Sequence, residues 1–387
     1  MTTTRDKRHT QLVRPYGTFG RNEWAFVGGR CSLTKSLADN LIKALSPLYK
    51  CSYIDSLHPD QVQPLPGRIA SGAFSEYIDN LNYKQLNYLS DLNSYQLRLR
   101  FSESDIVFTN GNHHPASAQV AVITEKKRAS LLKRMHQLTN VKLILLDGVS
   151  DVFDFVKEQL PNWKSIPIIK FNDTARIISF FEDEMQQREP KLNGLVLAGG
   201  KSTRMGQDKT VLNWHGKEQH YHLADLLKTQ CDEVFISCRA DQQETINGEY
   251  KALPDTFIDL GPFGAILSAF RQHPDRAWLV VASDLPLMDE ATLKFLNQRR
   301  HVSSIATAFR SPETGFPEPL ITIWEPKSYP VLLWFLAQGY SCPRKVLINS
   351  DTYLLHAPDE NVLTNVNTPE EADRVKKILE QKSEENG

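Results

Sequence analysis

The stretch from Leu192 to Lys209 constrains the fold more than any other part of the chain, because an apolar strand leads directly into a loop rich in glycine and cations. Leu192–Leu197 is short and largely apolar, as expected of a central strand. Ala198, Gly199 and Gly200 then remove side chains where the backbone must turn, and bare N–H groups in such a turn can bind anionic oxygens. We therefore expect an α/β domain with an anion-binding loop after this strand.

Three cations follow within the loop and the next turn: Lys201, Arg204 and Lys209. Such a density suits a triphosphate, whose charge must be held and then stabilised as it moves to a leaving pyrophosphate. A Walker A loop is excluded, because its earlier glycine position is taken by Leu195 inside the strand. The pattern predicts a nucleotide-using enzyme whose loop cations bind the phosphates.

The string Leu197-Ala-Gly-Gly-Lys-Ser-Thr-Arg-Met-Gly-Gln-Asp-Lys209 resembles the signature of the molybdenum cofactor guanylyltransferases, within the nucleotidyltransferase superfamily. The resemblance extends over roughly residues 190–380 and implies a Rossmann-like nucleotidyltransferase fold there. It implies a base or ribose contact by Asp255 and further nucleotide contacts, largely through backbone groups, by Leu197, Ala198, Gly199, Gly200, Lys201 and Lys209.

The run Leu279–Pro286 is an apolar strand that ends in an acidic residue and a proline. It places the carboxylate of Asp284 at the carboxyl edge of a parallel sheet, where open α/β sheets bind ligands. We expect Asp284 to be a catalytic residue and the ligand of Mg²⁺, which would screen the phosphate charge. The alternative is an aspartate that only caps a turn.

The segment Asn365-Val-Asn367-Thr-Pro-Glu-Glu resembles the family's N-V-N-T-P-E-E, which implies that Asn365 and Asn367 lie near the acceptor and the metal. It also has the pattern of a helix start, because Thr368 can cap and Pro369 suits the first turn. The two interpretations are compatible.

Residues 318–344 resemble the segment that faces the pterin acceptor. Arg344 and Lys345 suit either a phosphate or a solvated basic turn.

Two further features bear on the base. Gly261-Pro-Phe-Gly-Ala265 resembles the family's G-P-L-A-G turn, where small residues let the backbone approach a base or ribose. Gly264 and Ala265 exchange the family's alanine and glycine, and Arg239 stands about where the family often has an asparagine. A cytidylyltransferase or sugar-nucleotidyltransferase, which shares the loop and the Asp-x-Pro element, is therefore the alternative to the guanylyl assignment.

The resemblance implies a direct displacement, in which a phosphate of molybdopterin attacks the α-phosphorus of GTP and pyrophosphate leaves with Mg²⁺. A phosphate monoester is already anionic at neutral pH, so catalysis would consist mainly of alignment and charge stabilisation. In this mechanism Arg204 and Lys209 would be the catalytic residues that stabilise the charge. GTP and the molybdopterin cofactor are the implied partners. A homodimer and transient contact with other proteins of molybdenum-cofactor biosynthesis are further expectations.

Bulk composition excludes several classes of function. The 387 residues carry 45 Lys and Arg against 46 Asp and Glu, and a net charge of -1 gives no electrostatic case for nucleic acid or a membrane surface. No apolar run approaches a bilayer span, and the first residues lack the apolar core of an export signal. Five scattered cysteines suggest neither a disulfide framework nor a zinc knuckle, so a reducing cytoplasm is expected.

Several histidines are candidate ligands. His215, His220 and His222 cluster beside a predicted turn entering a helix, and we expect surface histidines there rather than a metal site. His58, His113 and His114 lie in predicted loops, where a ligand role competes with simple surface exposure.

The first half of the chain predicts a second α/β domain, with boundaries at 1–188 and 189–387 and three α/β/α layers in each domain. Residues 23–45 read as strand, glycine turn and helix, but Thr34 occupies the second glycine of a P-loop. Further strands are predicted at 51–55, 105–109, 142–147, ending in a Walker-B-like aspartate, and 167–171. The pattern faintly resembles the GTP-binding adaptor of molybdopterin-guanine dinucleotide biosynthesis. We expect a degenerate P-loop-like fold that serves docking, dimerisation or cofactor handling, and the alternative is a domain that hydrolyses a nucleotide.

Overall fold

The computed structural model describes residues 19–198, 213–366 and 368–385. The chain divides into two compact units, Met1–Arg188 and Glu189–Gly387, and each is described by itself. No helix among the described residues has the length and apolar character needed to span a membrane.

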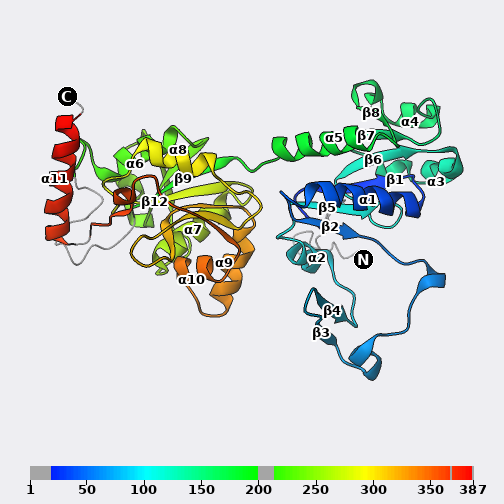
Figure 1. Cartoon of the computed structure of the whole chain (residues 1–387), viewed down its shortest axis with the longest axis horizontal. Helices are drawn as coiled ribbons and strands as arrows, with labels where there is room; N and C mark the ends of the chain where they lie inside the picture. Colours follow the sequence, from blue (N-terminus) through cyan, green and yellow to red (C-terminus); the bar gives the residue numbers. More distant parts are fainter. Residues whose placement is uncertain (1–18, 199–212, 367, 386–387) are drawn as a thin grey trace, which may run out of the picture. The chain divides into compact units, whose positions relative to one another are not determined.

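The N-terminal unit is built on a six-stranded parallel sheet in the order β2-β5-β1-β6-β7-β8 (Figure 1). Its strands are β1 (Glu23–Val27), β2 (Cys51–Ile54), β5 (Ile106–Asn110), β6 (Ala118–Ile123), β7 (Val141–Leu146) and β8 (Ile168–Lys170). Its α-helices are α1 (Cys31–Leu45), α2 (Ser94–Arg100), α3 (Arg128–Leu132), α4 (Asp154–Gln159) and α5 (Thr174–Gln187).

Central strand β1 is buried on both faces and so separates two helical layers. Trp24 packs edge to face on Phe181 of α5, with ring centroids 4.9 Å apart, and α5 also contacts α1. Ala25 and Val27, which point the other way, belong to a core cluster with Leu131 of α3 and Val156 of α4. Since successive strand residues face opposite sides, the unit has the three α/β/α layers that the sequence predicts.

An arm leaves this sheet between β2 and α2. It carries a two-stranded antiparallel hairpin, β3 (Ser75–Asp79) and β4 (Lys84–Tyr88), which stands apart from the helical layers (Figure 1). Large apolar side chains are exposed on the arm, among them Phe74, Tyr77 and Leu81. This hairpin was not predicted from the sequence.

The C-terminal unit is built on a seven-stranded sheet in the order β11-β10-β9-β12-β14-β13-β15. Its strands are β9 (Leu192–Leu197), β10 (Glu233–Cys238), β11 (Lys251–Pro254), β12 (Ala277–Ala282), β13 (Ala306–Arg310), β14 (Pro317–Trp324) and β15 (Thr352–Leu355). The first four strands are mutually parallel, whereas β14 runs antiparallel to β12 and β13.

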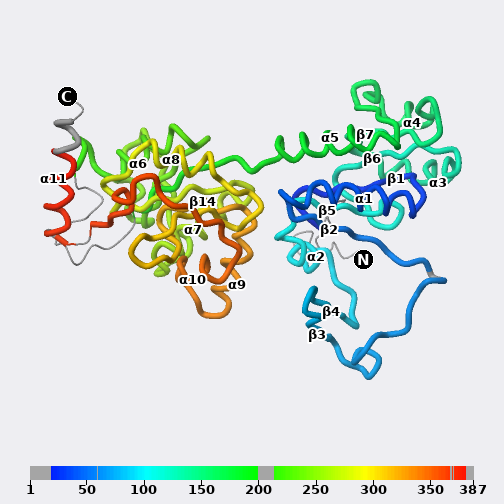
Figure 2. Tube along the Cα trace, viewed as in Figure 1, coloured from blue at the N-terminus to red at the C-terminus, as the bar shows by residue number. Residues whose placement is uncertain are grey.

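Helices cover both faces of this sheet, and Figure 2 traces the chain through them from green to red. The α-helices are α6 (Gln219–Lys228), α7 (Gly261–Gln272), α8 (Glu290–Gln298), α9 (Ser328–Ala337), α10 (Pro343–Ile348) and α11 (Pro369–Glu385). Val196 of β9 joins a core with α6 and α8. Its neighbour Leu195 joins a core with α7, α9 and α10. The apolar run Leu192–Leu197 is thus a central strand, as predicted, because both of its faces are covered.

Helix α11 lies outside these two layers (Figure 1). Its Val375 forms a small separate core with Leu287 and Val366. The start of α11 is capped: Thr368 Oγ1 accepts a hydrogen bond from the Glu371 N–H, and Glu371 Oε2 accepts one from the Thr368 N–H. This reciprocal pair is a capping box, so the predicted helix start after Asn365 is confirmed.

Candidate active site

The sequence candidates of the C-terminal unit gather at one edge of its sheet. The parallel strands β9, β10, β11 and β12 all end there, and the strand order reverses at β9, with β10 on one side and β12 on the other. Crevices beyond the carboxyl ends of strands, where the order reverses, are the usual ligand sites of open α/β sheets. Ala198, Asp255 and Asp284 follow β9, β11 and β12 at this edge.

Leu197 and Ala198 mark the entry to the signature loop. The Ala198 N–H donates to the Ser237 carbonyl at 3.3 Å, and the Ser283 N–H donates to the Leu197 carbonyl at 3.3 Å. The backbone entering the loop is thereby tied to both neighbouring strands. The remaining loop candidates lie outside the described residues, and their roles stay predictions: Gly199, Gly200, Lys201, Arg204 and Lys209.

Three segments hold the loop that begins at Asp284. The Val366 N–H donates to the Asp284 carbonyl at 2.9 Å. Gln219 Nε2 donates to the Leu285 carbonyl at 3.1 Å, in a buried position. His215 Nε2 lies 2.9 Å from the Pro286 carbonyl and donates to it, because a carbonyl oxygen can only accept. The Asp284 loop is therefore fixed by its surroundings. His215 was expected only as a surface histidine, and none of these three hydrogen bonds was predicted.

Asn365 is brought to this loop by its neighbour Val366. Asn365 is half-buried, and Asn367 lies outside the described residues. The same segment therefore leads into the capped start of α11 and contacts the backbone of the Asp284 loop.

Asp255 lies at the end of β11, where its N–H donates to the Cys238 carbonyl at 2.9 Å. Burial raises the pKa of Asp255 to about 6. A 2.9 Å hydrogen bond from Ser237 Oγ lowers this pKa, but burial has the larger effect. A half-buried carboxylate of this kind can accept hydrogen bonds from ligand hydroxyl or amino groups while it is ionised.

The predicted turn at residues 261–265 is wrong, because these residues form the first turns of α7. Proline suits the first turn of a helix as well as a bend. A Cβ on Gly264 would lie 2.2 Å from the Phe257 carbonyl oxygen, so the glycine allows the helix to pack on the loop after Asp255. Ser268 Oγ accepts from the Thr256 N–H at 2.8 Å and donates to the Gly264 carbonyl at 2.7 Å. The small residues thus position the Asp255 loop.

Two arginines at this edge are paired with acids of the chain itself. Arg239 donates through Nε to Asp241 Oδ1 at 3.1 Å. Arg344 donates to Glu318 Oε2 at 3.0 Å, and Glu318 lies at the start of β14, which reaches the same edge because β14 is antiparallel to β12. A phosphate at Arg344 would have to compete with Glu318.

The expectation of surface histidines is wrong for His220, because α6 turns this side chain inward and buries it. Its Nε2 lies 3.6 Å from a Glu218 carboxylate oxygen. His215 and His222 stack with ring centroids 3.9 Å apart. Burial and the neighbouring His215 lower the pKa of His222 to about 4. These histidines do not form a three-ligand set in the part of the chain that the structure describes.

The surroundings of Asp284 can be tested against Mg²⁺. Across residues 19–198, 213–366 and 368–385, the acidic groups near Asp284 form no cluster of three ligand atoms. Mg²⁺ is commonly held by one or two carboxylates together with substrate phosphates and water. A single carboxylate beside the entry to the predicted phosphate-binding loop fits that mode, and not an all-protein cage.

In the N-terminal unit, the near-P-loop does not have the arrangement of a phosphate loop. Gly28 turns with φ +96° after β1, and α1 begins at Cys31. Thr34 is buried in this helix, and the Lys35 ammonium lies 3.5 Å from an Asp55 carboxylate oxygen. The Walker-B-like Asp147 follows β7, which is separated from β1 by β6. These features support the degenerate interpretation of the motif.

Comparison with known proteins identifies relatives. Residues 194–352 match the family of the MobA-like NTP transferase domain. The molybdenum cofactor biosynthesis bifunctional protein of Synechocystis sp. is 30% identical over 234 residues, which are 60% of this chain and 67% of that protein. The C-terminal unit is about half of the chain, so this match reaches into the N-terminal unit.

One further curated protein and one solved structure are similar to the chain. The probable molybdenum cofactor guanylyltransferase of Natronomonas pharaonis is 34% identical over 140 residues, 35% of this chain and 68% of that protein. Among solved structures, the molybdopterin-guanine dinucleotide biosynthesis protein A from Archaeoglobus fulgidus is 20% identical, with a TM-score of 0.42, over 49% of this chain and 99% of that chain.

Proposed function

The chain belongs to the family of molybdenum cofactor guanylyltransferases, with a MobA-like NTP transferase domain, and from this premise we propose that it transfers GMP from GTP to the phosphate of molybdopterin. Pyrophosphate is the second product. The acceptor phosphate forms a bond to the α-phosphorus, and the bond from that phosphorus to the leaving pyrophosphate breaks.

The observation that carries this proposal is the meeting of separate motifs at one sheet edge. Ala198 at the start of the signature loop, Asp255, and the Asp284 loop with its Val366 contact all lie at the carboxyl ends of parallel strands of one sheet. A nucleotide bound at this edge would place its phosphates between the signature loop and Asp284.

The chain's residues would act mainly by alignment and charge stabilisation. The molybdopterin phosphate is anionic at neutral pH, so no strong general base is needed. Arg204 and Lys209 would stabilise the charge that develops on the leaving pyrophosphate. Backbone groups of the signature loop would hold the nucleotide, Asp255 would accept from its base or ribose, and Asn365 and Asn367 would border the acceptor.

Mg²⁺ would be held by Asp284, and when bound it would screen the phosphate charge. Asp284 does not need to donate or accept a proton in this role. Its task is to present a carboxylate oxygen at a fixed place, which the three contacts to its loop favour.

Pyrophosphate release from each of GTP, CTP, ATP and UTP, with Mg²⁺ and molybdopterin, tests the proposal. We expect release with GTP and strong loss in Asp284→Ala. Preference for CTP would assign the chain to the cytidylyl alternative. Pyrophosphate release that does not depend on molybdopterin would contradict the proposal that molybdopterin is the acceptor.

A further inference from the structure

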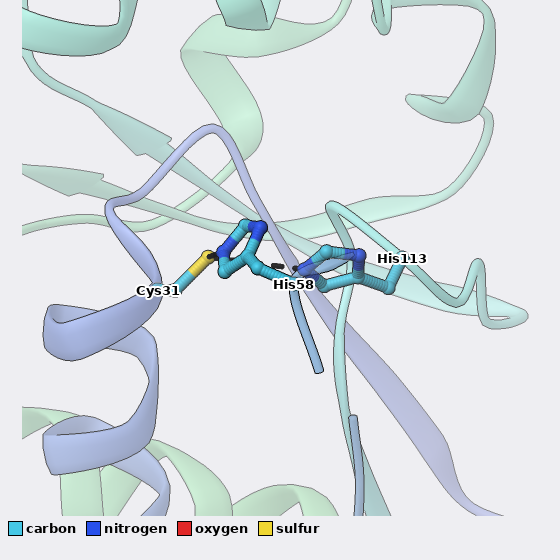
Figure 3. A group of neighbouring side chains, drawn as sticks. All are labelled: Cys31, His58 and His113. Carbon is cyan, nitrogen blue, oxygen red and sulfur yellow. Dashed lines mark hydrogen bonds between the residues drawn. The ribbon is translucent and has the colours of Figure 1, made fainter. Parts of the chain in front are cut away.

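Three metal-binding side chains meet in the N-terminal unit, away from the site described above. Cys31 is the first residue of α1, His58 lies in the arm that follows β2, and His113 lies in the loop after β5. Figure 3 shows the thiol and the two imidazoles turned toward one another from these separate segments. Cys31 Sγ lies 3.6 Å from His58 Nε2 and 3.9 Å from His113 Nε2.

The spacing fits ligands around one ion. With Zn–S about 2.3 Å and Zn–N about 2.0 Å, a tetrahedral site places sulfur and nitrogen roughly 3.5 Å apart. The two sulfur–nitrogen distances are close to that value, and all three ligand atoms lie within 4.8 Å of one another. His58 is exposed, so its ring can rotate to close the remaining gap, and an ion can enter from solvent.

We propose that Cys31, His58 and His113 form a binding site for a divalent cation of the zinc class. A thiolate with two imidazoles selects a borderline-soft ion over Mg²⁺ or Ca²⁺, which prefer oxygen ligands. Three protein ligands leave the fourth tetrahedral position for water or an exogenous ligand.

The surrounding charges favour a cation at this place. Asp55 Oδ1 lies 3.9 Å from His113 Nε2, and Asn110 Nδ2 donates to the same oxygen at 2.9 Å. The carboxylate is thus held beside the ligand atoms. Lys35, which pairs with Asp55 at 3.5 Å, offsets part of this negative charge. His114, the neighbouring histidine in the sequence, is engaged elsewhere, with its Nε2 2.8 Å from Ser56 Oγ.

The proposed site also assigns a metal-binding role to the region of the degenerate P-loop. Cys31 opens the helix that follows the β1 glycine turn, where a P-loop would face phosphate. The β2 and β5 connections bring the histidines to the same carboxyl edge of the sheet. The competing explanation is a thiol hydrogen-bonded to imidazole with no ion.

Cobalt binding separates these explanations. The full chain, without a histidine tag and stripped by a chelator, is titrated with Co²⁺, and thiolate-to-cobalt charge-transfer absorption is recorded. We expect a single ion per chain, displacement by Zn²⁺, loss of the charge-transfer band in Cys31→Ser, and affinity lowered by about tenfold or more in His58→Ala and His113→Ala. Cys342→Ser and His136→Ala, which alter a cysteine and a histidine outside the cluster, serve as matched controls and should bind Co²⁺ as the parent chain does.

Absence of the charge-transfer band in the parent chain would overturn the proposal, and so would a band that persists in Cys31→Ser. Circular dichroism of each metal-free variant shows whether it folds. If a variant does not fold, the thermal midpoint of the parent chain is measured with Zn²⁺ and with an equal concentration of Mg²⁺. A rise with Zn²⁺ alone would support the site, and no rise would contradict it. Asp284→Ala should bind Co²⁺ normally, so failure of the proposed transfer activity and failure of this site can be told apart.

Discussion

The backbone N–H of Val366 donates a 2.9 Å hydrogen bond to the backbone carbonyl of Asp284. This bond joins the capped start of α11 to the loop after β12, two parts of the chain that are distant in sequence. It brings the residue next to Asn365 into contact with the backbone of the Asp284 loop, so that the two motifs lie in contact.

The role of Asp284 predicts the effect of removing its charge. Asp284→Asn keeps the size of the side chain but removes the anionic ligand, so we expect pyrophosphate release to fall by about a hundredfold or more. Asp232→Asn is the matched control, since Asp232 precedes β10 at the opposite edge of the same sheet and pairs with Arg276. Steady-state rates of both variants at saturating GTP measure the difference, and equal losses would refute the assignment.

Gln219 predicts a coupled change in stability and metal dependence. Gln219→Ala leaves the buried Leu285 carbonyl without its donor, which should lower the free energy of unfolding by about 1–3 kcal/mol. The loosened Asp284 loop should also require more Mg²⁺ for half-maximal rate. Gln338→Ala removes a similar side-chain amide bond to a carbonyl, but an exposed one, and should change little. Urea unfolding and Mg²⁺ titration test both effects; a Gln219→Ala chain as stable as the control would contradict them.

Asp255 predicts a pH dependence of stability. Its folded pKa of about 6 lies above the unfolded value of 3.8, so the folded protein binds more protons between about pH 4 and 6, and stability decreases as pH rises through this window. Asp255→Asn lacks that change. Its thermal midpoint relative to the parent chain should therefore be higher at pH 7 than at pH 4. Thermal midpoints of both proteins are measured at steps of one pH unit. A difference between the two midpoints that does not change with pH would contradict the prediction.

Gly264 predicts a packing effect on the Asp255 loop. Gly264→Ala places a Cβ 2.2 Å from the Phe257 carbonyl oxygen, and overpacking of this kind costs about 1–3 kcal/mol of unfolding free energy. Gly248→Ala is the control, because a Cβ there meets nothing within 4 Å. Denaturant unfolding of the two variants should separate them clearly, with the control near the parent chain.

Much of the fold could be predicted because buried parallel strands are apolar runs bounded by glycine or acids. The predictions at 51–55, 105–109, 142–147 and 167–171 correspond to β2, β5, β7 and β8 within a residue or two. Strand β6 was missed although Ala118–Ile123 is fully buried, since a short apolar run after a histidine-rich loop has no period that distinguishes it from a helix.

The site was less accessible from sequence. A hydrogen bond from a side chain to a backbone carbonyl, such as that from Gln219 to Leu285, cannot be recognised from the type of the accepting residue. His220 is buried because it lies on the side of α6 that packs on the protein core. Residues 261–265 were predicted as a turn, although they begin a helix, because proline is compatible with both a turn and a helix start. Cys31, His58 and His113 meet only because three strands end at one edge, so their sequence spacing does not match any metal motif.

A competition between two nucleotides tests the central claim most directly. The full chain is given equal GTP and CTP with Mg²⁺ and molybdopterin, and the products are identified by mass. The proposed function predicts a guanine dinucleotide of molybdopterin with an equal amount of pyrophosphate. A cytosine dinucleotide, or nucleotide consumption with no pterin-linked product, would contradict it.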